Sequence, residues 1–266
     1  MNSAARSGTI TALAILFSLA VLSASRAVMA QDQEAGAPAD RKRGGGWSLG
    51  AGVVSSARPY VGADNELFPV PLLQYHRGGF FVEGIRAGYR WGGERAWRFE
   101  LYGAPLFAGL DPDDSPFLAG MEERETSLDG VAALSWNRPH VELALGLHSD
   151  LLGRNHGQRL RATAGFPWQA GRWRFSPSVG VIGYDDDFVD YYAGVRPEEA
   201  RPGRPAYEGR SNWNPEAGFS AIWLPGDRWI LLIGVDYQRL GSAITASPIV
   251  EDDWILSGFT GVGIRF

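Results

Sequence analysis

The side chains that could perform acid–base or nucleophilic chemistry are few and widely spaced in this sequence. His148 and Asp150 lie two positions apart, with Ser149 between them. On an extended strand the first two share a face about 7 Å apart, since each residue rises ~3.3 Å, and Ser149 points the other way. The three therefore cannot form a local catalytic triad. His140 and His156 fall at the ends of predicted strands, and structural histidines with satisfied hydrogen bonds are the simpler interpretation.

One acidic run could in principle hold a divalent cation. Asp185-Asp186-Asp187 offers carboxylate oxygens, but the run lacks the glycine and the distal glutamate of a calcium loop. A solvated acidic turn is the favoured interpretation. The sequence contains no cysteine, which excludes disulfides and thiolate metal sites. We predict no catalytic residue, no metal site and no cofactor, and expect that the protein is not an enzyme.

The amino-terminal residues have the pattern of an export signal. Arg6 precedes an apolar stretch from Ile10 to Leu22, and Val28-Met29-Ala30 offers a small-residue cleavage site before Gln31. Residues 1–30 are therefore predicted to be a signal peptide, and residues 31–46 a flexible leader in the periplasm. Cleavage leaves 23 basic and 30 acidic side chains, a net charge of −7. That charge argues against a nucleic-acid partner.

The last thirteen residues alternate between two faces with a period of two, which indicates a strand. One face is apolar with aromatics at both ends, and the other is mostly small or polar. This is typical of an outer-membrane strand with one face toward lipid and one toward a lumen. The terminal Phe266, with Ile264 and Val262 on the same face, resembles the closing-strand signal of bacterial outer-membrane barrels. A soluble sandwich that ends on an edge strand is the alternative.

The preceding hairpin repeats this pattern. Each of its apolar faces spans about nine to eleven residues, the length that a tilted strand needs to cross hydrocarbon. Each face also begins and ends on an aromatic residue, as expected of side chains at the two membrane interfaces. The predicted interface aromatics are Trp213, Trp223, Trp229, Tyr237 and Trp254.

Similar segments recur from Trp47 onward, separated by turn residues. We predict that residues 47–266 form an all-β, antiparallel transmembrane β-barrel of about twelve strands, with ten as the alternative. Counting strands back from Phe266 places 194–212 and 241–253 outside the cell and 224–228 in a periplasmic turn. It places 109–123 on the periplasmic side, where the segment is long for a turn. Its acids are candidates for binding a partner: Asp111, Asp113, Asp114, Glu122 and Glu123.

Charged residues of both signs share the predicted inward faces. Examples are Arg86, Arg90 and Glu100. Buried charges are costly unless they are paired, so ion pairs that fill the lumen are the favoured interpretation. A water-lined pore is the alternative, because a twelve-strand barrel lies between filled and open sizes.

Four motifs, in order, resemble the MipA/OmpV family of outer-membrane proteins. They are Pro59-Tyr60-Val61-Gly62-Ala63-Asp64, Pro69-Val70-Pro71, the stretch from Tyr192 to Ala200 followed by Pro205-Ala206-Tyr207, and Ser247-Pro248-Ile249-Val250. Ala193-Gly194 departs from the aromatic-glycine pair that is more usual there. The resemblance covers 47–266. It implies a non-enzymatic scaffold for murein synthesis in the outer membrane, similar to a family member that bridges a lytic transglycosylase and a bifunctional murein synthase.

Two other hypotheses remain open on the sequence. Strand number and a charged lumen would also suit a small passive channel for solutes or antibiotics. An outer-membrane hydrolase is the third hypothesis. Capture of a murein enzyme would favour the scaffold, whereas conductance in a planar bilayer would favour the channel.

Overall fold

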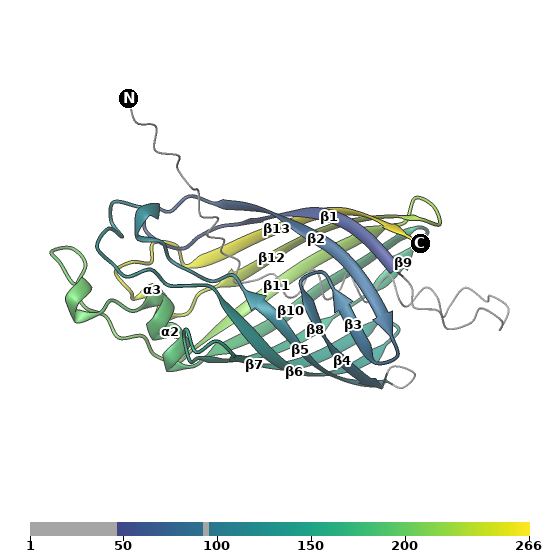
Figure 1. Cartoon of the computed structure of the whole chain (residues 1–266), viewed down its shortest axis with the longest axis horizontal. Helices are drawn as coiled ribbons and strands as arrows, with labels where there is room; N and C mark the ends of the chain where they lie inside the picture. The colour runs from purple at the N-terminus through teal and green to yellow at the C-terminus, as the bar shows by residue number, and fades with distance from the viewer. Residues whose placement is uncertain (1–46, 93–95) are drawn as a thin grey trace, which may run out of the picture.

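The computed structural model describes residues 47–92 and 96–266. The predicted signal peptide and leader, residues 1–46, lie outside the described residues. The described chain forms a closed antiparallel β-barrel that is capped at one end by loops and short helices (Figure 1). The strands are β1 (Trp47–Ser56), β2 (Glu66–Arg77), β3 (Phe80–Glu83), β4 (Arg86–Gly92), β5 (Trp97–Leu106), β6 (Ser127–Arg138), β7 (Val141–Asp150), β8 (Gln158–Gly165), β9 (Trp168–Ala170), β10 (Trp173–Tyr184), β11 (Asn212–Trp223), β12 (Trp229–Arg239) and β13 (Trp254–Arg265).

The barrel closes by pairing of β1 with β13 and of β10 with β11. β8 and β9 both pair with β10 in one continuous register, in which Ser178 lies opposite Gly165 and Phe175 opposite Trp168. They are therefore one wall strand, interrupted at Phe166-Pro167 because proline supplies no N–H to a ladder. Counted in this way the wall has twelve strands, which confirms the predicted barrel and strand number.

Residues 80–92 form two short strands, β3 and β4, although their hydrophobic pattern suggests one. Taken alone, the alternation of apolar residues in 81–91 predicts one strand whose apolar face is broken by Glu83. The chain instead reverses at Gly84-Ile85, where Glu83 pairs with Arg86. Gly84 has a φ of +60°, a conformation that glycine adopts without steric cost. After this turn Glu83 and Arg86 both face the lumen, so the apparent break in the pattern marks the hairpin.

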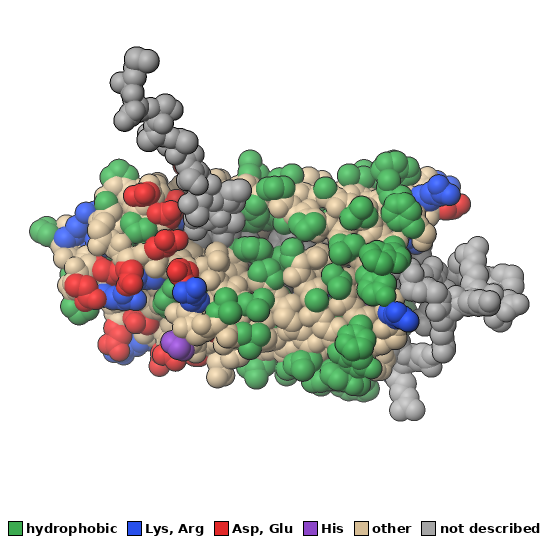
Figure 2. All heavy atoms as spheres, in the orientation of Figure 1, with side chains coloured by type: hydrophobic (Ala, Val, Ile, Leu, Met, Phe, Trp, Pro, Cys, Tyr) green, Lys and Arg blue, Asp and Glu red, His purple; other side chains and the backbone are tan. Residues whose placement is uncertain are grey.

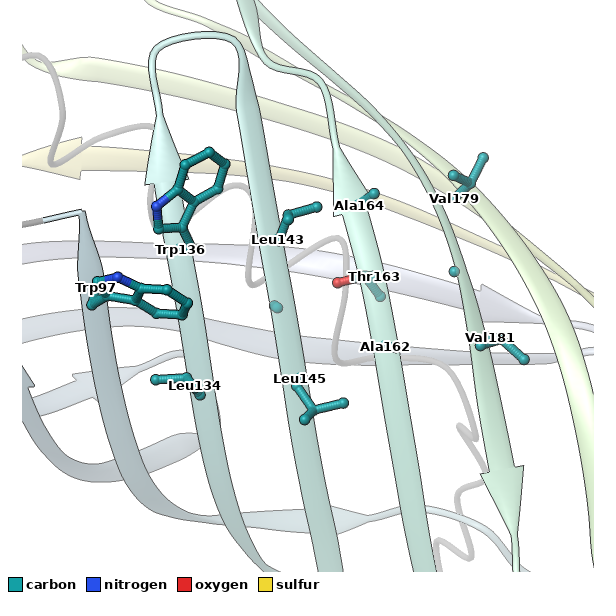
Figure 3. Close-up of a pocket in the computed structure, with 12 residues that line it drawn as sticks. Trp97, Leu134, Trp136, Leu143, Leu145, Ala162, Thr163, Ala164, Val179 and Val181 are labelled. Atoms are coloured by element: carbon teal, nitrogen blue, oxygen red, sulfur yellow. The ribbon is translucent and has the colours of Figure 1, made fainter.

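The two faces of the wall differ as the alternation predicts. In β12, Leu231, Ile233 and Val235 are exposed on the outer surface, whereas Ile230 and Asp236 are buried on the inner one. Hydrophobic side chains accordingly cover the middle of the molecule in Figure 2. Ala162 and Ala164 of β8 lie between larger side chains of β7 and β10 and form a shallow apolar trough on this surface (Figure 3).

The two ends of the barrel differ in their connections. One end carries tight turns such as the one between β11 and β12, together with the carboxyl-terminal end of β13. The other carries the long segments 57–65, 107–126, 185–211 and 240–253. These include η1 (Pro112–Asp114), α2 (Asp186–Ala193), η2 (Pro197–Glu199) and α3 (Ser242–Thr245). Outer-membrane barrels have short periplasmic turns and long extracellular loops, which makes the second end extracellular.

This arrangement corrects one prediction. Residues 109–123 connect β5 to β6 at the same end as 194–211 and 241–253, so their predicted position on the periplasmic side is wrong. Four wall strands, β6, β7, β8–β9 and β10, separate 109–123 from 194–211, and an even number of crossings returns the chain to the same end. The count back from Phe266 that gives the periplasmic side is therefore one strand out. None of the helices in the described part of the chain is long and apolar enough to cross a membrane.

Candidate functional site: the lumen and the extracellular cap

Ion pairs occupy the lumen on the side formed by β2 to β5. Glu83, at the tip of the β3–β4 hairpin, accepts from Arg86, from Arg90 at 2.8 Å and from His76 at 2.8 Å. Arg90 also donates to Glu100 of β5 at 2.5 Å. The two carboxylates are 1% exposed. This network ties the hairpin to its neighbours on both sides, which a short hairpin needs because it makes few ladder hydrogen bonds.

A second set of pairs lies on the lumen face of β6 to β11. Arg159 of β8 donates to Asp129 of β6, and His148 lies 3.4 Å from the same carboxylate. Arg161 donates to both carboxylate oxygens of Glu216 at 2.7 to 3.1 Å. The two arginine pairs each skip one strand of the wall, from β8 to β6 and from β8 to β11, whereas His148 is on β7, next to β6. They brace the wall on its inner face, and little of the charged surface of their side chains is in contact with water.

The opposite side of the lumen is apolar. Val54, Phe68, Val70 and Phe259 form one buried cluster on β1, β2 and β13. Leu232 of β12 packs against this cluster and against a second one nearer the periplasmic end. The lumen therefore has one charged wall and one apolar wall, and the side chains of both are largely buried.

A folded cap covers the extracellular end of the lumen. Asp185 caps α2 by accepting a hydrogen bond from the Phe188 N–H at 2.9 Å. The buried face of α2 places Phe188, Val189 and Tyr192 against residues at the extracellular ends of β5 and β10. Phe188 stacks on the Tyr184 ring, with 4.6 Å between ring centroids. The helix thus extends the apolar core of the cap into the mouth of the barrel.

Three of the four sequence motifs meet in this cap. The Tyr60 hydroxyl donates to the Tyr192 carbonyl at 3.1 Å, and the Ser247 hydroxyl donates to the Ala193 carbonyl at 2.5 Å. Tyr60 and Val250 form a β-bridge. Burial raises the pKa of the Tyr60 phenol to about 12. Residues of three motifs that are distant in the sequence therefore contact one another directly, and these contacts hold the cap together.

The predicted partner-binding acids belong to this cap. Asp111 and Asp114 form the capping box of η1, and Asp114 also accepts from Arg58. Asp113 donates its main-chain N–H to Asp111. Glu122 pairs with Arg196. These pairs hold the segment to other extracellular residues. Glu123 is exposed at the same end. The five acids therefore do not form a periplasmic docking surface. Figure 2 shows acidic side chains gathered at this end.

A buried ion pair that the sequence patterns missed holds the same segment. Arg124 donates to both carboxylate oxygens of Glu199, at 2.8 and 3.0 Å, and both residues are buried. Glu199 also accepts from the main-chain N–H groups of Glu122 and Arg196 at 2.9 Å. Glu199 lies within the third motif, but nothing in that motif indicates a partner 75 positions away.

The predicted assembly and interface residues lie on the outer surface. Phe266 is 84% exposed, Val262 is exposed and Ile264 is half-buried. All five predicted interface aromatics, Trp213, Trp223, Trp229, Tyr237 and Trp254, are exposed at strand ends. Their proposed roles in assembly and at the membrane interfaces remain predictions.

The residues examined for catalysis and metal binding have structural contacts. His148 lies beside Asp129, whereas Asp150 accepts from Ser127 and from three main-chain N–H groups, those of Leu152, Asn155 and His156. Asp185 caps α2, and Asp186 accepts from the Ser211 N–H. Each of these carboxylates serves to hold a loop or a helix end in place.

An exposed apolar belt, aromatic strand ends, a charged interior and unequal ends define an outer-membrane β-barrel. The family model described as "MltA-interacting protein MipA" matches residues 49–266, and the chain belongs to this family of outer-membrane proteins. This agrees with the resemblance to the MipA/OmpV family.

Curated relatives share about a quarter of their residues with the chain. The putative outer membrane protein YiaT of Escherichia coli K12 is 26% identical over 82% of this chain and 90% of its own length. The MltA-interacting protein of Escherichia coli K12 is 25% identical over 84% and 91%. Among solved structures, the COG4313 outer membrane channel from Pseudomonas putida F1 is 12% identical, covers 86% and 99%, and has a TM-score of 0.45.

Proposed function

We propose that this outer-membrane protein is a non-enzymatic scaffold that holds murein-synthesising and murein-cleaving enzymes at its periplasmic end. The paired charges of the lumen carry the proposal. With the carboxylates of Glu83, Glu100, Asp129 and Glu216 paired and buried, and a folded cap above them, the surfaces that we assign to function are the two ends. One relative is named for interaction with MltA, which supports a periplasmic lytic transglycosylase as a partner.

The periplasmic end supplies a docking surface of defined charge. Arg77, Arg138, Arg172 and Arg228 are exposed at its turns, and we call them the periplasmic rim. Asp227 is the exposed acid beside them within the described residues. Complementary charge steers association and fixes orientation. The rim therefore suits a partner with an acidic surface, whereas the acidic segment 109–123 would suit a partner with a basic one.

A passive channel is the rival function. A solute path would have to pass side chains that are almost fully buried, such as Glu83, Glu100 and Asp129. Opening it would separate buried ion pairs, which costs several kcal/mol per pair as an order of magnitude. The pairs therefore favour the scaffold over conduction in the closed arrangement.

The test is affinity capture from detergent extracts at low salt, read by mass spectrometry, beside conductance of the purified protein in planar bilayers. We expect recovery of a lytic transglycosylase and a murein synthase, weaker recovery at high salt, and no steady conductance. Charge reversal of Arg77, Arg138 and Arg228 to Glu should reduce that recovery.

The matched control reverses three exposed arginines at the extracellular end, Arg154, Arg210 and Arg239. This variant has the same change in net charge and should capture the enzymes normally. Equal loss in both variants would remove the rim from the mechanism. Steady conductance without captured enzymes would replace the scaffold by the channel.

A further inference from the structure

The barrel wall is interrupted between β2 and β5. The β3–β4 hairpin that separates these strands is short, and it turns at Gly84-Ile85. β3 pairs only with Gln74–Arg77 of β2, and β4 reaches only as far as Gly103 of β5. Among the described residues no strand pairs with β2 above Leu73, or with β5 above Gly103, on the facing sides. We call this interruption the seam.

Three prolines lie on the edges of the seam. The Gly84 N–H donates to the Leu73 carbonyl, so the odd-numbered residues of β2 direct their polar groups toward the seam. Pro69 and Pro71 are therefore the residues without an N–H on that edge. On the other edge the Asn137 N–H donates to the carbonyl of Ala96, which precedes β5. The even-numbered residues of β5 therefore direct their backbone N–H and C=O groups toward β6, and the odd-numbered ones, Pro105 among them, direct their backbone toward the seam.

This placement removes donors that would otherwise be unpaired in lipid. An unsatisfied backbone N–H inside a bilayer costs several kcal/mol as an order of magnitude. Proline lacks this N–H, and it is found at strand edges for that reason. Because these prolines cannot donate ladder hydrogen bonds, the two edges are not suited to pair with each other.

The seam lies within the hydrocarbon region. Tyr75 of β2 packs on Trp47 at the periplasmic aromatic level, with 4.6 Å between ring centroids. Pro69 is six residues above Tyr75, which corresponds to roughly 15 Å for a tilted strand. Pro105 is eight residues above Trp97, or roughly 20 Å. Since the apolar band of such barrels is about 25 Å tall, the seam opens toward the outer leaflet.

Apolar side chains lie directly behind the seam. Phe68, just before Pro69, and Val70, between Pro69 and Pro71, face inward and pack with Val54 and Phe259. Phe107, which follows β5, packs against Phe68 with 6.5 Å between ring centroids. On the other edge, Tyr102 packs with Phe81 and Val131, and Ala104 lies against them. The seam thus joins the lipid outside to the apolar wall of the lumen.

We propose that the seam is a lateral site at which an acyl chain of an outer-leaflet lipid enters the wall and contacts the apolar side of the lumen. Hydrocarbon matches the side chains behind the seam, and Pro69, Pro71 and Pro105 present no N–H to it. Phe107 lies at the top of the seam on Phe68 and limits how far the chain penetrates. The site is independent of any partner at the periplasmic rim.

The test uses the native protein in bilayers that contain a phospholipid with a diazirine in the middle of its acyl chain. After illumination, the adducts are mapped by mass spectrometry of peptides. We expect adducts on inward-facing Phe68, Val70 or Phe259, besides those on outward-facing residues such as Leu231. Inward-facing Ser135 of β6 lies opposite Arg98, in the part of β5 that is paired on both sides, and should remain unmodified. Adducts confined to outward-facing residues would overturn the proposal.

A pair of variants gives a second measurement. Phe107→Ala removes the ring that covers the top of the seam and should increase the adducts on Phe68 and Val70. Phe99→Ala removes an outward-facing ring from β5, the strand that Phe107 follows, and should leave those adducts unchanged. Heat-modifiable migration on gels verifies that both variants are folded. Equal adduct yields at Phe68 and Val70 in native protein and Phe107→Ala would contradict the assigned place of Phe107.

Discussion

The hydroxyl of Tyr60 donates a hydrogen bond to the main-chain carbonyl of Tyr192, 132 positions further along the chain. Tyr60 follows the first strand of the barrel, whereas Tyr192 lies in α2, beyond the tenth. Tyr60 also pairs with Val250, which precedes the last strand. This one side chain therefore joins the extracellular segments from the beginning, middle and end of the barrel, and holds the cap over the lumen.

Removing this hydroxyl should loosen the cap. Tyr60→Phe keeps the ring but leaves the Tyr192 carbonyl without its donor, which costs ~1–3 kcal/mol for a buried group. We expect faster trypsin cleavage at exposed arginines of 196–210, with little change in the urea midpoint of the whole barrel. Tyr237→Phe, on the outer surface, is the control. Identical cleavage rates in the three proteins would show that the bond does not hold the cap.

The same tyrosine should make the cap sensitive to alkaline pH. Its pKa is raised to about 12, above the value of about 10 for an unfolded tyrosine. The stabilising effect is complete below pH 10 and is lost as the pH rises from 10 to 12. Cleavage of native protein should accelerate across that interval, and Tyr60→Phe should accelerate less.

The corrected topology can be tested by labelling. The chain has no native cysteine, so single substitutions give clean signals. Asp113→Cys and Glu208→Cys should both react with an impermeant maleimide on intact cells, since both segments lie at the capped end. Gly226→Cys should react only after the outer membrane is permeabilised. Protection of Asp113→Cys on intact cells would return residues 109–123 to the periplasmic side.

The sequence predicts the barrel well because each lipid-facing strand carries its own signal. Trp229 to Tyr237 reads as a membrane strand without reference to any neighbour, since alternation and aromatic ends are local properties. The β3–β4 hairpin is missed because four residues are too few to establish a period, and Glu83 appears as an error in a longer strand. The partners of Glu199 and Tyr60 are missed because long-range pairs in loops have no periodic signal.

The lipid face and the lumen face should respond differently to the same substitution. Leu231 contacts the lipid side, whereas its neighbour Leu232 packs against both apolar lumen clusters. Leu231→Ala should change the urea midpoint little, and Leu232→Ala should lower the free energy of unfolding by ~2–5 kcal/mol because it leaves a cavity. Leu231→Arg should cost ~2–4 kcal/mol near the bilayer centre. Equal effects of the two alanine substitutions would show that the assigned faces are wrong.

Phe266 should matter for assembly more than for stability. Its main-chain N–H donates to the Trp47 carbonyl at 3.0 Å, but its side chain is 84% exposed and adds little packing. We expect Phe266→Ala to reduce the folded protein recovered from outer membranes and to increase periplasmic degradation. The purified variant, refolded in detergent, should unfold at nearly the same urea concentration as the native protein, because the main-chain bond remains. Val262→Ala, on the same face but inside the strand, is a matched comparison. If Phe266→Ala reaches the outer membrane at native levels, the terminal aromatic is not the assembly signal of this chain.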